Sequence, residues 1–145
     1  MKAYADTGFL VSLHSRDANS DRAIARMESH TVSIAWTWLH DLEFKNAIRL
    51  QVFRKMIKPA DIQRIMHDQA LDVQAGIYLM AAPALSAVAR EAERLSELYT
   101  ETLGNRSLDV LHVAHALTLG AKIFLTFDLR QGALADAAGL KVPKL

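Results

Sequence analysis

A short apolar stretch near the C-terminus, Lys122-Ile-Phe-Leu-Thr-Phe-Asp128, decides the expected fold. Nearly every residue between its charged ends is apolar, which is typical of a parallel strand buried on both faces of a sheet. Purely parallel sheets of this kind occur in α/β proteins, whose helices cover both faces. We therefore expect the sequence on the N-terminal side of this stretch to alternate strands with helices.

The hydrophobic pattern of the chain fits that alternation. It predicts strands at residues 2–5, 31–34, 77–80, 122–127 and 140–142. It predicts that one helix starts after Asp6 and that the next helix ends near residue 29. Further helices are predicted at 36–53, 59–75, 84–103, 107–119 and 131–138, with Ser107 as the cap of the helix at 107–119. The prediction is an α/β three-layer sandwich, a central parallel sheet flanked by helices, in a single domain over residues 1–145.

Composition narrows the classes of function. The 17 Lys and Arg residues against 16 Asp and Glu give a net charge of +1, so any contact with nucleic acid must be local. The absence of cysteine excludes disulfides, thiolate metal sites and cysteine nucleophiles. No apolar run approaches the roughly 20 residues of a membrane span. We expect a soluble protein that stays in the cytoplasm.

Two acidic residues directly follow predicted strands. Asp6 comes after the strand at 2–5, and Asp128 comes after the strand at 122–127. Because ligands of open parallel sheets bind beyond the carboxyl ends of the strands, both side chains are expected at one functional edge. The alternative is that each aspartate only caps the helix that follows it.

Two further acids lie on predicted helices. Helical spacing puts Glu43 on the largely apolar face of the helix at 36–53, where a carboxylate needs compensation, whereas Asp41 points elsewhere. Asp109 lies in the first turn of a very apolar helix. The alternatives are a surface glutamate at the border of the apolar face and, for Asp109, stabilisation of the helix dipole.

Clustered carboxylates repel one another, and a hard divalent cation such as Mg²⁺ or Mn²⁺ is the usual remedy. Such ions lower the pKa of bound water and stabilise the leaving oxygen in phosphodiester hydrolysis. A rival route is imidazole acid and base chemistry, or a metal pair, at His112 and His115, which lie three apart on one predicted helix. The simpler interpretation is that these two histidines pack in the core or support the ligating residues.

These segments resemble the PIN domain family, in particular the VapC-type toxin ribonucleases. The matching motifs are Tyr4-Ala-Asp-Thr-Gly-Phe-Leu-Val-Ser-Leu13, Glu43 on its helix, Arg106-Ser-Leu-Asp-Val-Leu-His-Val-Ala-His-Ala-Leu117, Phe124-Leu-Thr-Phe-Asp-Leu-Arg130 and Ala137-Ala-Gly-Leu-Lys-Val142.

The resemblance implies a PIN-like fold and a Mg²⁺- or Mn²⁺-dependent endoribonuclease that is the toxin of a type II toxin–antitoxin system. It makes Asp6, Glu43, Asp109 and Asp128 the catalytic and metal-binding residues. The partners it implies are structured RNA such as transfer RNA, a VapB-like antitoxin and a second copy of the chain in a homodimer.

The sequence departs from the family after the fourth acid. Many members have a further acid or an aromatic residue where this chain has Leu129-Arg-Gln-Gly132, so a second metal site is in question. Thr126 matches a family hydroxyl position and could hold a metal-bound water or orient a carboxylate; a strand residue without that role is the alternative.

Basic and apolar residues suggest contact surfaces. We expect Arg106 and Arg130, which adjoin the acidic motifs, to contact RNA phosphates. A second basic group, Arg49, Arg54, Lys55 and Lys58, is interpreted as a solvated face. An apolar surplus is expected to include a surface for the antitoxin or a second subunit, with plain core packing as the alternative for each residue; its members are Trp36, Trp38, Phe44, Val52, Phe53 and Ile57.

Other functions remain as alternatives. A catalytically weak PIN-fold module that binds RNA or a protein partner would keep the fold without the activity. A receiver domain needs paired early acids and a lysine after a late strand, but Asp6 stands alone and Lys122 precedes its strand. A haloacid-dehalogenase-type phosphatase needs a second aspartate where this chain has Gly8.

Overall fold

The computed structural model describes residues 2–145 and contains a four-stranded parallel sheet in the order β3-β2-β1-β4. The strands are β1 (Lys2–Ala5), β2 (Ser33–Trp36), β3 (Tyr78–Met80) and β4 (Ile123–Leu125). The helices are α1 (Thr7–His14), α2 (Ser20–Ser29), α3 (Trp38–Phe53), α4 (Pro59–Gln74), α5 (Leu85–Leu95), α6 (Glu101–Leu103), α7 (Ser107–Thr118) and α8 (Leu129–Ala137).

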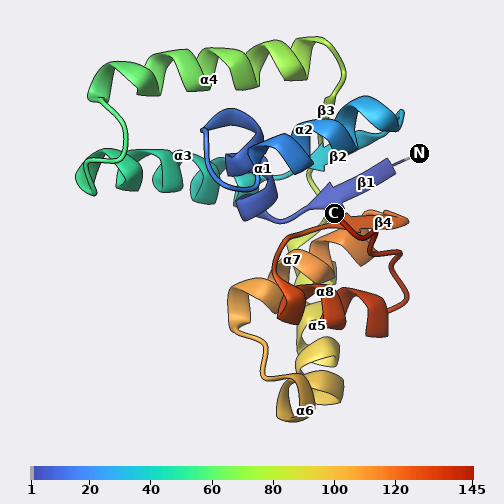
Figure 1. The fold of residues 1–145 in the computed structure, drawn as a ribbon. Coiled ribbons are helices and arrows are strands. Elements are labelled where there is room, and N and C mark those ends of the chain that lie inside the picture. The colour runs from blue at the N-terminus through green and yellow to red at the C-terminus, as the bar shows by residue number, and fades with distance from the viewer. Residues whose placement is uncertain (1) are drawn as a thin grey trace.

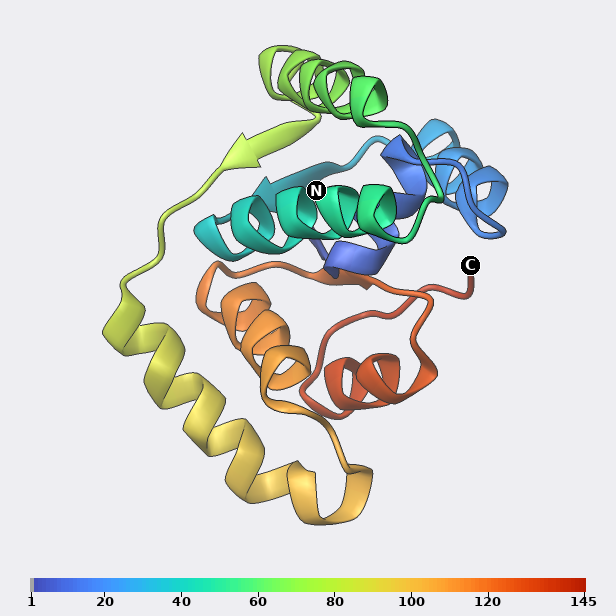
Figure 2. The same ribbon diagram turned by 90° about the vertical axis from the view of Figure 1, so that its left-hand side faces the viewer.

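Helices cover both faces of the sheet, as the apolar strands predict (Figure 1). Successive residues of β1 and β4 enter opposite cores: Ala3 and Leu125 pack with α1 to α4, whereas Tyr4 and Phe124 pack with α5, α7 and α8. The three-layer α/β sandwich predicted from the sequence is confirmed. Figure 2 shows the two helical layers above and below the sheet.

Several predicted boundaries were wrong. The strand placed at 31–34 lies at Ser33–Trp36, and the strand placed at 122–127 is only Ile123–Leu125. The terminal strand predicted at 140–142 is reduced to one isolated bridge, in which Lys141 pairs with Ile123 of β4.

Two helical predictions also need correction. The helix expected at 84–103 contains a π-helical segment, Ser96–Thr100, between α5 and α6. Ser107 is the first residue of α7 rather than its cap, and Arg106 occupies the N-cap position.

The apolar residues divide between the two interpretations, core packing and an exposed surface. Trp36 and Phe44 are fully buried in the core that lies under α1 to α4, because β2 and the inner face of α3 pack there. Ile57 packs against the same core. Trp38 is half-exposed and Phe53 is 83% exposed.

The two phenylalanines of α3 make a matched pair for testing this burial. Phe44→Ala should lower the free energy of unfolding by about 3–5 kcal/mol, because it leaves a cavity in the core. Phe53→Ala should change it by less than about 0.5 kcal/mol, since that ring contacts mainly solvent. Urea denaturation followed by circular dichroism measures both, and equal losses would contradict the orientation of α3.

Candidate active site

Asp6 stands where β1 ends, and its carboxylate is held by two donors. It is the N-cap of α1, and its Oδ1 accepts the backbone N–H of Phe9 at 2.7 Å. Its Oδ2 accepts the Thr126 hydroxyl at 2.5 Å. The side chain is only 8% exposed, and burial raises its pKa although both hydrogen bonds act to lower it.

Thr126 connects Asp6 to Asp128. Its hydroxyl donates to Asp6 and accepts the backbone N–H of Asp128 at 2.9 Å. Asp128 is the N-cap of α8, and its Oδ1 accepts the N–H groups of Arg130 at 2.8 Å and Gln131 at 3.0 Å. The helix-capping interpretation of Asp6 and Asp128 therefore applies to both, at the sheet edge where the sequence predicted them. The Thr126 hydroxyl orients the Asp6 carboxylate.

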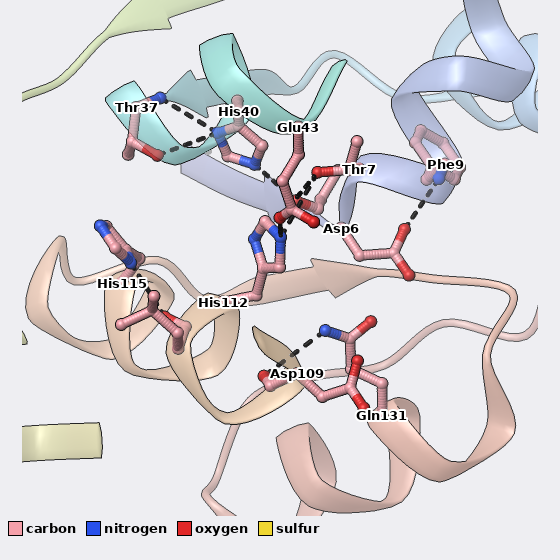
Figure 3. A network of polar contacts seen from close by, with 12 residues as sticks. Asp6, Thr7, Phe9, Thr37, His40, Glu43, Asp109, His112, His115 and Gln131 are labelled. Carbon is pink, nitrogen blue, oxygen red and sulfur yellow. Dashed lines mark hydrogen bonds and ion pairs between the residues drawn. The ribbon is translucent and has the colours of Figure 1, made fainter. Parts of the chain in front are cut away.

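Glu43 extends from α3 toward a buried histidine on α7 (Figure 3). Its Oε1 lies 2.5 Å from His112 Nε2 and accepts the Thr7 hydroxyl at 3.4 Å. His112 is 3% exposed, and its Nδ1 lies 2.9 Å from the Tyr4 hydroxyl. Asp41 instead accepts the indole N–H of Trp36 and pairs with Lys45, away from this group.

Sequence reasoning placed His112 among residues that pack or support the ligands, without naming its contact. The structure shows that it joins Glu43 to the buried Tyr4. The available signal was its position three residues after Asp109, which places both on one side of the same helix. His115 lacks such a role: its Nδ1 bonds the carbonyl of Leu111, and its ring lies against Trp38.

Asp109 is linked to the rest of the group through Gln131. The Asp109 Oδ2 accepts the backbone N–H of Arg106 at 3.3 Å. The backbone carbonyl of Asp109, not its carboxylate, accepts the side-chain amide of Gln131 at 3.5 Å. Gln131 is 2% exposed, and its Oε1 lies 3.4 Å from the oxygen of the Thr126 hydroxyl, whose proton goes to Asp6. Contacts thus run from Asp6 through Thr126 and Gln131 to Asp109. From the sequence, Gln131 was noted only as part of a departure from the family pattern.

His40, in the first turn of α3, connects that helix to the end of β1. Its Nδ1 accepts the backbone N–H of Thr37 at 3.0 Å, so its Nε2 carries the proton and donates it to the Ala5 carbonyl at 2.8 Å. Burial, with some repulsion from His112, lowers the pKa of His40 to about 3. The start of α3 is thereby tied to the residue before Asp6.

A groove of about 400 Å³ opens beside Asp6 and Asp128. Thr7, Gly8 and Phe127 also line it, and its far side reaches Asp17. Within residues 2–145, no three acidic or histidine side chains stand close enough together to hold a metal ion. Each of the four predicted carboxylates accepts a hydrogen bond from a protein donor.

The donor set nevertheless suits a hard cation. All four predicted ligands supply carboxylate oxygens, which Mg²⁺ and Mn²⁺ prefer. Across the described chain, no hydrogen bond engages Oδ2 of Asp128, Oδ1 of Asp109 or Oε2 of Glu43, so each of these carboxylates keeps one oxygen for a metal ion. The residues fit a metal by chemistry, with two carboxylates already at one groove.

Comparison with known proteins identifies the class. The sequence matches the PIN domain over residues 3–137, so the chain belongs to the PIN domain family. A comparison with curated proteins finds no match. Within the described chain, no helix is both long enough and apolar enough to cross a membrane.

Solved structures share this fold. VapBC2 from Rickettsia felis, bound to a DNA fragment from their promoter, has a TM-score of 0.68 at 16% identity, over 99% of this chain and 98% of that one. VapC20 from Mycobacterium tuberculosis, a Sarcin-Ricin loop cleaving toxin, has a TM-score of 0.68 at 13% identity, over 97% of this chain and 98% of that one. FitAcB from Neisseria gonorrhoeae has a TM-score of 0.65 at 18% identity, over 98% of this chain and 96% of that one. At these identities the likeness concerns the fold.

The state of His40 gives a direct test of the site geometry. Because its folded pKa of about 3 lies below the ordinary value, His40 should remain neutral, with the proton on Nε2, from pH 8 down to pH 5. Two-dimensional ¹⁵N NMR of the imidazole rings measures the tautomer, and His40→Phe assigns the signal. Protonation of His40 above pH 5, or a proton on Nδ1 alone, would contradict the Thr37 and Ala5 contacts.

Proposed function

We propose that the protein is a metal-dependent endoribonuclease of the VapC type, the toxin of a type II toxin–antitoxin system. The observation that carries the proposal is the groove at the carboxyl edge of the sheet, where Asp6 and Asp128 meet through Thr126 in a PIN fold. Glu43 adjoins it through Thr7, and Asp109 adjoins it through Gln131. The proposed substrate is structured RNA, with transfer RNA as one candidate.

Asp6, Asp109, Asp128 and Glu43 would hold Mg²⁺ or Mn²⁺. When bound, such an ion supplies an activated water and neutralises charge on the scissile phosphate. A single ion would be held at the groove by the carboxylates of Asp6 and Asp128. The stretch Leu129-Arg-Gln-Gly132, where many family members place a further acid or an aromatic residue, supports one ion rather than two.

The protein's own residues would orient the acids and the RNA. Thr126 holds the Asp6 carboxylate toward the groove, and His112 holds the Glu43 carboxylate. Arg106 and Arg130 are exposed; the Arg106 guanidinium pairs with Asp109 at 3.8 Å, and the Arg130 guanidinium donates to the Gly104 carbonyl at 3.5 Å. Both would exchange these contacts for phosphates on either side of the cut.

The expected partners follow from the relatives. The similar VapBC2 is a toxin–antitoxin pair by name, which supports a VapB-like antitoxin for this chain. We also propose a homodimer, a single domain over residues 1–145, and action in the cytoplasm, where its RNA substrates would lie. A catalytically weak module that only binds RNA or a partner is the second candidate, favoured by the hydrogen-bonded state of all four acids.

Cleavage assays separate these two functions. Purified protein should cut total transfer RNA in the presence of Mn²⁺ or Mg²⁺. Mutation of a residue that only orients a metal ligand typically lowers metal affinity or activity about 10–100-fold. Because Asp6 and Asp109 would be ligands themselves, Asp6→Asn and Asp109→Asn should each lower the cleavage rate more than about 100-fold. Asp41→Asn, which alters an acid on α3 that faces Trp36 and Lys45, is the matched control and should keep the rate. Equal rates for all four proteins would remove the acids from the mechanism.

Metal binding can be measured without RNA. Isothermal titration calorimetry should detect one Mn²⁺ per chain in the wild-type protein and a loss of affinity in Glu43→Gln, because a neutral amide is a weaker ligand than a carboxylate. Excess chelator should abolish cleavage. Cleavage that persists in the chelator would favour acid and base chemistry by histidine instead.

A further inference from the structure

The end of α3 and its turn into α4 form a basic arm, defined here as residues 49–58. Its cations are Arg49, Arg54, Lys55 and Lys58, and the segment contains no acid. All four side chains are exposed, and in the described part of the chain none of them forms an ion pair. Four cations without counter-ions repel one another, which an anionic partner would relieve.

The arm also exposes large apolar side chains. Phe53 is 83% exposed and Met56 is 63% exposed, between and beside the cations. An exposed ring among cations is the combination that binds single-stranded nucleic acid, because bases stack on the ring while phosphates contact the charges. An acidic protein partner would use the charges but has no comparable need for a flat exposed ring.

The backbone of the arm is strained at a lysine. Lys55 has a φ of 58°, the only positive φ at a non-glycine residue within residues 2–145. It follows the end of α3, where Lys55 N–H bonds the Val52 carbonyl and Met56 N–H bonds the Gln51 carbonyl. This pair of bonds is the Schellman ending, whose left-handed position is normally glycine.

Other helices of this protein do use glycine there. The same two bonds close α4, α7 and α8, with Gly76, Gly120 and Gly139 at the left-handed position. A side chain at that position strains the backbone, and such strain at an exposed site points to a function of the side chain itself. Among the helix ends of residues 2–145, the arm alone has a cation at this position.

The arm is held firmly and lies on the side of the acids. Gln51 accepts the Ser15 hydroxyl at 2.6 Å, and Ile57 packs against the core. α3 starts just beyond the carboxyl end of β2 and runs outward past this edge of the sheet (Figure 1). The helical rise puts Phe53 about 15 Å along α3 from Glu43, a span of a few nucleotides.

We propose that the basic arm binds the RNA strand beyond the site of cleavage, with phosphates on its four cations and a base on Phe53. The RNA class rests on the proposed function, but the binding does not require catalysis. Lys55 is kept in its strained conformation because its ammonium group contacts the strand.

Binding is measured by fluorescence anisotropy with a labelled 20-nucleotide single-stranded RNA in chelator, which prevents cleavage. R49A/R54A/K58A should bind at least about 10-fold more weakly than wild type. Its slope of log affinity against log salt should be shallower by about 2, since each phosphate contact contributes about 0.7. The control R90A/K122A/K141A removes equal charge elsewhere and should bind within about threefold of wild type. Equal losses in both would reduce the effect to net charge and overturn the proposal.

Two single variants test the ring and the strain. Phe53→Ala should weaken binding about fivefold or more while the protein remains folded. Lys55→Gly should raise the melting temperature by about 2–4 °C, because it relieves the strain, and yet should weaken RNA binding severalfold. A more stable Lys55→Gly with unchanged affinity would show that the strained lysine does not serve RNA binding.

The outcomes also separate this proposal from the proposed function. RNA cleavage by wild type with unchanged binding by the arm variants would overturn the arm and leave the nuclease. Arm-dependent RNA binding without any cleavage would leave the arm and overturn the nuclease. Arm-dependent binding of labelled poly-glutamate, with no RNA bound by wild type, would overturn the proposal in favour of an acidic protein partner.

Discussion

The parallel pairing of β1 with β4 is the constraint on which the candidate site depends. Ala5 is registered against Leu125, and the N–H of Asp6 bonds the Leu125 carbonyl at 3.0 Å. That register brings Asp6 and Thr126, which are 120 residues apart in sequence, within hydrogen-bond distance. A slip by one residue would turn every side chain of β4 to the other face and separate the two. The contact between Asp6 and Thr126 therefore depends on the register of β1 against β4.

Below this edge, aromatic and imidazole rings replace the usual aliphatic packing. Tyr4 lies against the rings of His40, His112 and Phe124. Burial raises the pKa of Tyr4, so its hydroxyl remains protonated and can bond His112. These groups hydrogen-bond one another, and they hold the backbone of Ala5 and the side chain of Glu43 in place.

The sequence predicts the architecture well because strand burial and helix period are local signals. Asp6 and Asp128 could be placed at one edge because both follow strands of a parallel sheet. The sequence left open whether Trp36 and Phe44 pack in the core or on a surface, because apolar composition does not reveal which side of an element packs. The roles of His112 and Gln131 depend on contacts between distant segments, and the turn of each carboxylate toward its donor depends on side-chain geometry that no local pattern carries.

Three of the four acids stand at helix N-termini, where Asp6 and Asp128 cap α1 and α8 and Asp109 bonds the first turn of α7. A lineage that abandoned catalysis would still gain stability from keeping these aspartates. Glu43 caps no helix, and its buried contact with His112 serves no helix end. If such a protein lost its catalytic role, Glu43 would thus be the first of the four acids to be replaced. Its presence should therefore distinguish a catalytic member from a non-catalytic one better than any of the aspartates does.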